Sequence, residues 1–99
     1  MGKILRFAFN QGRDREGIEG DMALAIFAAE CIHGRPRVRM ETRYLISPGG
    51  SGCVMELSGD AGEAAAQVFA GLATARFGEE GVSINRFEEK QLEVLDDGT

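Results

Sequence analysis

The chain has few of the residues from which metal sites and active sites are built. It contains two cysteines and one histidine among 99 residues, and Cys31 and Cys53 are too far apart for a zinc-binding signature. It has no nucleophile elbow, dinucleotide-binding fingerprint or metalloprotease motif. Acid–base catalysis would have to combine His33 with Glu30 on the same predicted helix. We therefore expect no metal and no cofactor, and a non-catalytic role is favoured over an enzyme.

Long apolar runs are also missing from the chain. No stretch approaches the roughly 18 to 20 consecutive apolar residues of a membrane span. The N-terminus has one lysine and a strand-like stretch where a signal peptide would have a longer apolar segment. These absences predict a cytosolic chain without membrane contact, and the reducing cytosol favours two buried thiols over a disulfide.

The residues that are present suit one small globular domain. Apolar residues make up 43% of the 99-residue chain and charged residues 27%, and one ordinary domain needs about this length. We predict a single domain over residues 1–95, followed by a disordered tail over 96–99.

The net charge of −5 is unevenly distributed along the chain. Residues 1–49 contain eight Arg and Lys against six Asp and Glu, whereas residues 50–99 contain three against ten. The excess of acid argues against a general polyanion binder. Any anionic partner would meet the first half of the chain.

Four segments alternate between side chains of different character, which is the period of a β-strand. They are residues 3–9, 37–46, 53–58 and 82–87. The glycine-rich turn between the second and third segments predicts that these two form a hairpin. Residues 90–95 could extend the fourth strand.

A first helix is predicted over residues 21–33, with Asp21 as its N-terminal cap. The polar segment over 10–20 precedes it and is predicted to be a loop. Because this helix is apolar nearly all the way round, we expect it to be covered on more than one side. That excess of apolar surface points to a partner.

A second helix is predicted over residues 64–77, after a capping-box spacing at Asp60 and Glu63. The element order is then β-α-β-β-α-β, which is typical of the ferredoxin-like two-layer sandwich. In this α+β fold both helices cover one face of an antiparallel sheet, and the first and third strands are central. The opposite face of the sheet is left without helical cover.

The uncovered face is predicted to mix apolar side chains with arginines, as protein interfaces do. We therefore predict a binding or assembly domain that forms a homodimer or a small subunit of a complex. The face is expected to contain Ile4, Arg6, Ala8, Arg37, Arg39, Glu41, Arg43, Leu45, Val54, Glu56, Ser58, Ser83, Asn85 and Phe87.

Four arginines are the candidate binding residues of this face. Arginines two positions apart project together from a strand and can contact anionic oxygens. Alternatively, they form cross-strand ion pairs with the glutamates of the same face. Phe87, on an edge strand, is the single aromatic side chain there that could stack on a base, so nucleic-acid binding is not expected. The four are Arg6, Arg37, Arg39 and Arg43.

The polar segment over 10–20 supports an alternative function. Ferredoxin-like domains often place ligands after the first strand, so by analogy of fold the chain would be a small-anion or nucleotide-binding regulatory domain. The acidic residues of this segment lack the spacing of a calcium loop. The candidate donors to an anion are Asn10, Gln11, Arg13 and Arg15.

The run from Ala23 to Phe77 contains a small apolar helix, an arginine-rich hairpin that ends in ELSGD, and an alanine-rich helix. In this order of elements it resembles the small dimerising subunit of the KEOPS tRNA-modification complex. The likeness covers about half of the chain, and the fourth strand over 82–87 departs from that subunit. The resemblance implies a homodimeric subunit of a larger tRNA-modifying assembly.

Overall fold

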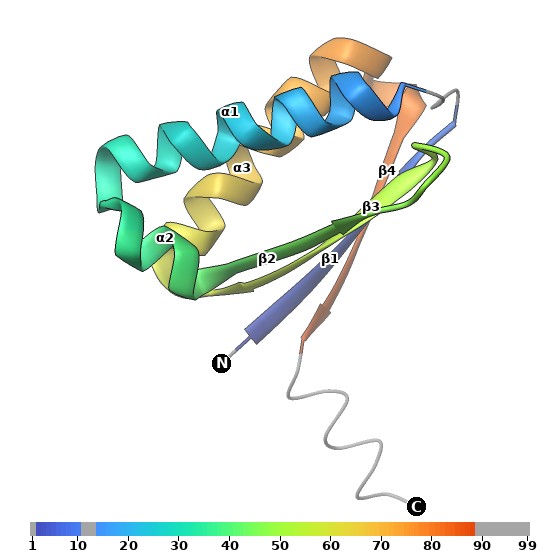
Figure 1. Cartoon of the computed structure of the whole chain (residues 1–99). Coiled ribbons are helices and arrows are strands. Elements are labelled where there is room, and N and C mark those ends of the chain that lie inside the picture. Colours follow the sequence, from blue (N-terminus) through green and yellow to red (C-terminus); the bar gives the residue numbers. More distant parts are fainter. Residues whose placement is uncertain (1, 11–13, 89–99) are drawn as a thin grey trace, which may run out of the picture.

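The computed structural model describes residues 2–10 and 14–88, which form a layer of strands and a layer of helices (Figure 1). The predicted strand extension over 90–95 and the predicted tail over 96–99 lie outside the described residues. The described elements are β1 (Gly2–Phe9), α1 (Arg15–His33), α2 (Arg35–Glu41), β2 (Thr42–Ile46), β3 (Gly52–Ser58), α3 (Gly59–Phe77), the 3-10 helix η1 (Glu79–Gly81) and β4 (Val82–Glu88).

The four described strands form one antiparallel sheet in the order β2-β3-β1-β4. The prediction that the first and third strands are central is therefore confirmed. Phe7 of β1 pairs with Cys53 of β3 on one side and with Ile84 of β4 on the other. The described helices lie on one side of the sheet (Figure 1). The mixed α+β class is confirmed, with three helices in the described part of the chain.

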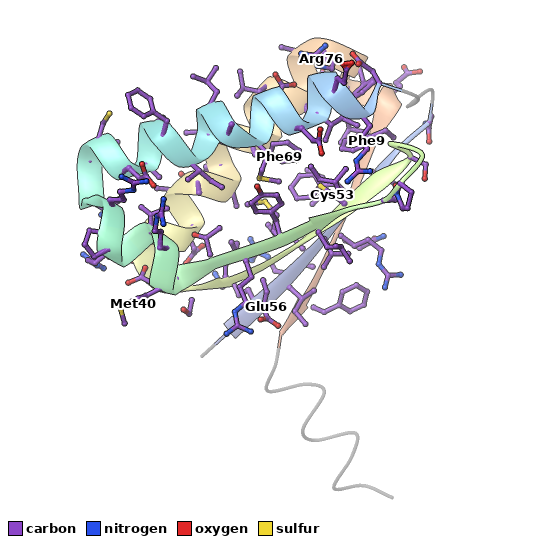
Figure 2. The ribbon with its side chains drawn as sticks, viewed as in Figure 1. Phe9, Met40, Cys53, Glu56, Phe69 and Arg76 are labelled. Atoms are coloured by element: carbon purple, nitrogen blue, oxygen red, sulfur yellow. The ribbon has the colours of Figure 1, made fainter. Side chains whose placement is uncertain are left out.

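The core lies between the sheet and the helices (Figure 2). Every second strand residue points into it, as the period-two alternation predicts. Phe7 and Met55 of the central strands are 1% and 0% exposed. Phe69 of α3 meets Phe7 edge to face, with ring centroids 5.0 Å apart. No polar or charged residue is buried among the described residues, so this layer is held together by apolar packing.

α1 begins at Arg15 and not at Asp21, so the predicted polar loop is wrong from Arg15 onward. Asp14 caps the helix by accepting a hydrogen bond from the Gly17 N–H at 3.0 Å. Asp21 instead accepts a hydrogen bond from Arg76 Nε at 2.7 Å. Arg76 also pairs with Asp14 at 3.1 Å. A side chain from the far end of α3 therefore holds the first turns of α1.

The second predicted strand is only partly correct, because helix α2 replaces its first half and β2 begins at Thr42. Pro36 lies in the first turn of α2, where its missing N–H leaves no helical bond unmade. Val38 is 0% exposed. Arg37 pairs with Glu41 one turn later at 3.2 Å. These interactions outweigh the strand-like alternation of the sequence.

The N-terminus of α3 receives its cap from another element. Glu41 of α2 accepts hydrogen bonds from the N–H groups of Ala61, at 2.9 Å, and Gly62, at 3.3 Å. A side chain on Gly62 would clash with the backbone carbonyl of Glu41, so glycine permits this approach. The predicted capping box is wrong, because Glu63 pairs with Lys3 of β1 at 3.0 Å.

The described residues cover α1 along one side only, and the further cover expected for this apolar helix is not supplied by them. Leu24, Phe27 and Ile32 are 52%, 62% and 74% exposed. Cys31 on the same helix is exposed, so the prediction of two buried thiols is wrong for it. Cys53 is buried, and burial raises the pKa of its thiol to about 12. None of the described helices combines the length and apolar character needed to span a membrane.

Candidate interaction surface

No described element covers the side of the sheet that faces away from the helices (Figure 1). Glu56 lies on this side in Figure 2, while Phe9, Cys53 and Phe69 lie on the helix side. We call this surface the open face. From the strand registers it consists of Ile4, Arg6, Ala8, Arg43, Leu45, Val54, Glu56, Ser58, Ser83, Asn85 and Phe87.

Apolar side chains cross the open face from one edge strand to the other. Leu45 of β2 pairs with Val54 of β3, and Ile4 of β1 pairs with Phe87 of β4. Leu45 is 74% exposed and Phe87 is 40% exposed. Apolar area of this kind, spread over all four strands, suits contact with another molecule better than contact with bulk water.

The charged groups of the open face make weak contacts with the other described residues. Arg43 and Glu56 approach to 3.9 Å, with side chains 85% and 55% exposed, and exposed pairs of this kind contribute little to stability. Arg6 stacks on Phe87, with its guanidinium carbon 5.9 Å from the ring centroid. These side chains therefore keep most of their hydrogen-bonding capacity for a partner.

Two of the four predicted arginines do not belong to this face. Arg37 and Arg39 lie on α2, so the structure does not bring them together with Arg6 and Arg43. Arg37 is held by its pair with Glu41. The predicted row of arginines is therefore wrong as a feature of the sheet, and the open face is less basic than the sequence indicated.

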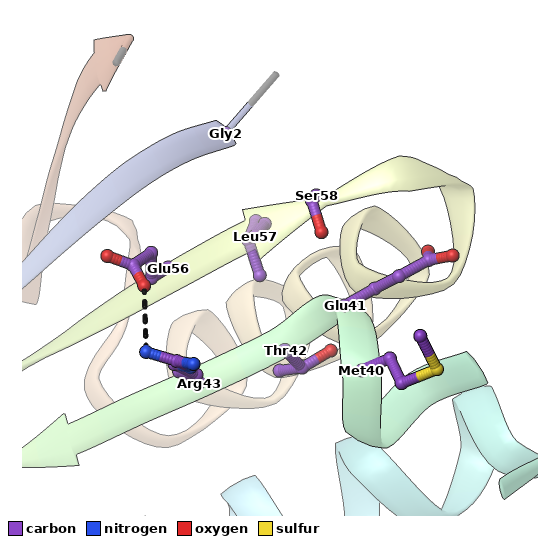
Figure 3. Close-up of a pocket in the computed structure, with 8 residues that line it drawn as sticks. All are labelled: Gly2, Met40, Glu41, Thr42, Arg43, Glu56, Leu57 and Ser58. Atoms are coloured by element: carbon purple, nitrogen blue, oxygen red, sulfur yellow. Dashed lines mark ion pairs between the residues drawn. The ribbon is translucent and has the colours of Figure 1, made fainter. Parts of the chain in front are cut away.

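A pocket of about 330 Å³ lies at one end of the open face, where α2 meets β2 and β3 (Figure 3). The Arg43–Glu56 pair lies along it, and Met40 beside it is 82% exposed. The Glu41 carboxylate is engaged at the N-terminus of α3 and is not free for a ligand. The pocket has room for a side chain of a bound molecule. Its lining is Gly2, Met40, Glu41, Thr42, Arg43, Glu56, Leu57 and Ser58.

The predicted anion donors that are described make contacts within the chain. Asn10 Nδ2 donates to a backbone carbonyl of η1 at 2.8 Å. Arg15 pairs with a glutamate one turn later in α1 at 3.3 Å. Gln11 and Arg13 lie outside the described residues. The N-terminus of α1, a favourable place for an anion, is already capped by the Asp14 carboxylate.

The residues considered for catalysis or metal binding are dispersed. His33 lies in the last turn of α1, where a positive charge interacts favourably with the helix dipole. Across residues 2–10 and 14–88, His, Cys, Asp and Glu form no group of three or more that could hold a metal ion.

One large side chain on the helix side of the sheet is exposed. Tyr44 points to the helix side of β2, because it pairs with the buried Met55, yet it is 49% exposed. The helices do not reach fully over this edge strand. The sequence contains one indication of this exposure. Tyr44 and Leu45 are adjacent, so two large side chains lie on opposite sides of a short strand.

Comparison with known proteins adds no assignment to this description. Neither a scan of protein-family models nor a search of curated proteins found a match to the chain.

Proposed function

We propose that this chain is a non-catalytic assembly domain that forms a homodimer through the open face. The observation that carries the proposal is the 74% exposure of Leu45 on a sheet face that also holds Ile4, Val54 and Phe87. Removing apolar area from water is favourable by roughly 25 cal/mol per Å², and this gain opposes the entropic cost of association. A second molecule on this face would supply that gain.

The charges of the open face favour a second copy as the occupant. Arg6 and Arg43 are positive and Glu56 is negative, so an identical face can offer opposite charges to each. Two such sheets can pack face to face at about 10 Å, as the sheets of β-sandwiches do. The pocket beside Met40 gives this flat contact a place for a projecting side chain.

The fold that we propose is the ferredoxin-like sandwich, with α2 inserted between α1 and β2. The order of the strands and main helices along the chain supports this assignment. The central positions of β1 and β3 and the placement of the helices on one side of the sheet support it as well.

The alternative functions have less support from the geometry. A small anion at the first loop would have to compete with the contacts that Asn10 and Arg15 already make. A KEOPS-like subunit would share the homodimer proposed here, and that resemblance stays a prediction, as does the cytosolic location.

Light scattering on dilution tests the homodimer. At tens of micromolar protein we expect twice the chain mass of 10.7 kDa. Leu45→Glu buries an unpaired charge in the interface, so we expect it to return the mass to 10.7 kDa at the same concentration. Tyr44→Glu is the matched control, because it places the same charge on the adjacent residue of β2, on the other side of the sheet.

The proposal is wrong if the wild-type chain has a mass of 10.7 kDa throughout this concentration range. It is also wrong if Tyr44→Glu dissociates the dimer and Leu45→Glu does not.

A further inference from the structure

The edge strand β2 is exposed on both of its sides. Leu45, on the open face, is 74% exposed, and Tyr44, on the helix side, is 49% exposed. Natural edge strands are usually protected by lysine, proline or a bulge, because an unprotected edge pairs with other strands. The sequence Thr42–Ile46 contains neither lysine nor proline. This edge is therefore open to pairing.

The backbone of β2 presents hydrogen-bonding groups to this edge. The Ser47 N–H donates to the Gly52 carbonyl at 2.9 Å. Along an antiparallel ladder, every second residue forms backbone hydrogen bonds with the neighbouring strand. Leu45 and Arg43, two and four residues before Ser47, therefore bond to β3. The N–H and C=O of Tyr44, between them, are directed away from β3. An added strand would find a donor and an acceptor there.

A groove lies beside this edge on the helix side. It has a volume of about 420 Å³ and runs between α1, α2 and β2. An added strand would place every second side chain over this groove, where Ile26 and Tyr44 supply apolar contact. Thr42 Oγ1 is buried and lacks a hydrogen-bond partner among the described residues. The groove is lined by Ile26, Glu30, Val38, Arg39, Thr42 and Tyr44.

The charge around the edge defines the chemistry of the occupant. Residues 30–43 contain four arginines and two glutamates, one of which, Glu30, lines the groove, although the whole chain has a net charge of −5. Arg37 and Arg43 have acidic partners, at 3.2 Å and 3.9 Å. Arg39, which lines the groove, forms no ion pair with any described residue. An acidic segment would be attracted to this corner.

We propose that β2 binds an extended acidic segment of another protein, which adds to the sheet as a fifth strand. Its main chain would bond to Tyr44, alternate apolar side chains would enter the groove, and an acidic side chain would pair with Arg39. A second copy fits this edge less well, because it would bring two arginine-rich corners together. A self-contact here in addition to the open face would also generate open-ended chains of molecules.

Fluorescence anisotropy with the full chain and a short labelled peptide of valine and glutamate tests this proposal. Valine and glutamate alternate in the peptide except at one position, where a glutamate replaces a valine and so lies on the side of the valines, within reach of Arg39. We expect saturable binding to the wild type. Tyr44→Pro removes the outward N–H without breaking a bond to β3, so affinity should fall roughly tenfold or more. Arg39→Glu should lower it by roughly tenfold as well, through repulsion. Because Arg39 is exposed, this second variant keeps the test decisive even if proline disturbs the fold.

Arg86→Glu on the opposite edge strand is the matched control, and we expect it to leave the affinity unchanged. The same peptide with lysine in place of glutamate should bind more weakly. Phe87→Glu, which should dissociate the proposed homodimer, should keep the peptide affinity, so the two proposals can fail independently.

Three results would overturn strand addition at β2. The first is no binding of the glutamate peptide by the wild type at about 1 mM, a concentration that detects even weak complexes. The second is equal affinity of the wild type and Arg39→Glu. The third is loss of affinity in Arg86→Glu with retention in Arg39→Glu, which would place the peptide at β4.

Discussion

The two faces of the sheet are built by the same strands and differ in almost every physical respect. On the helix side, Phe7 and Met55 are 1% and 0% exposed and pack with apolar neighbours alone. On the open face, Leu45 and Phe87 remain exposed and alternate with charged residues. The first face supplies the stability of the folded chain. The second holds apolar area that no described part of the chain covers.

The largest difference should appear when the same substitution is made on each face. Phe7→Ala opens a cavity in the core and should lower the free energy of unfolding by about 3–5 kcal/mol. Phe87→Ala removes a partly exposed ring and should cost less than about 1 kcal/mol in the monomer. Urea unfolding at low protein concentration measures both. Equal losses would show that the two faces do not differ as described.

The opposite pattern is expected for association: a substitution on the open face should weaken the homodimer and change the stability of the monomer little. Arg43→Glu places a carboxylate beside Glu56 on the open face, so we expect the dissociation constant of the homodimer to rise about 10- to 100-fold. Unfolding of the monomer should change by less than about 1 kcal/mol, because the Arg43–Glu56 pair is exposed. Sedimentation equilibrium measures the association. Arg86→Glu, whose position on β4 faces the helix side, is the control, and dissociation by it alone would contradict the account.

A smaller effect on stability is expected when Glu41, which belongs to neither face of the sheet, is replaced. Burial raises the pKa of its carboxyl, but hydrogen bonds from two backbone amides and Arg37 lower it more, so the pKa lies below the ordinary value of 4.5. A lowered pKa in the folded chain stabilises it above pH 4.5, and that stabilisation is lost as the pH falls through the folded value. Glu41→Gln should therefore lower the melting temperature at pH 7 without changing the mass of the assembly.

The difference in melting temperature between the wild type and Glu41→Gln should shrink as the solution is acidified below pH 4.5. Glu79→Gln, an exposed acid in η1, should show no such difference at any pH. If the difference in melting temperature between the wild type and Glu41→Gln stays constant down to strongly acidic solution, the Glu41 carboxylate does not cap α3.

The smallest effect concerns the buried polar atom on the covered side of β2. Thr42 Oγ1 has no hydrogen-bond partner within residues 2–10 and 14–88, and leaving such a group unpaired is unfavourable. Thr42→Val should therefore raise the free energy of unfolding by up to about 1 kcal/mol. Chemical denaturation measures the gain, and Thr74→Val on α3 is the comparison. A loss of stability in Thr42→Val would show that the hydroxyl is satisfied in solution.

Alternation of side chains was sufficient to predict three of the four strands, and the central positions of the first and third strands followed from the right-handed crossovers of the expected fold. This signal failed where the same residues fit both the two-residue period of a strand and the period of a helix. Residues 37–41 alternate like a strand, but Pro36 can begin a helix as well as end one. Glu41 at the end of this helix accepts a hydrogen bond from the N–H of Ala61, twenty residues away. A pattern of neighbouring residues cannot reveal an interaction over that distance.

The start of α1 was missed for a similar reason. The segment from Arg15 to Gly20 contains two glycines and several charges, which are typical of a loop. In the structure, Arg76 bonds to both Asp14 and Asp21 and joins this segment to α3. A different error, the interpretation of residues 37–41 as a strand, placed Arg37 and Arg39 on the sheet, so two of the four predicted arginines were misplaced. Ile4, Arg6, Leu45, Val54 and Phe87 were placed correctly because true strands carry them.

The most direct test of the open face is an isotope-filtered NMR experiment on a mixture of labelled and unlabelled chains, which detects contacts between copies alone. We predict intermolecular contacts from the methyl groups of Ile4, Leu45 and Val54. Absence of intermolecular contacts at millimolar protein, or contacts confined to Leu24 and Ile32 of α1, would contradict the account.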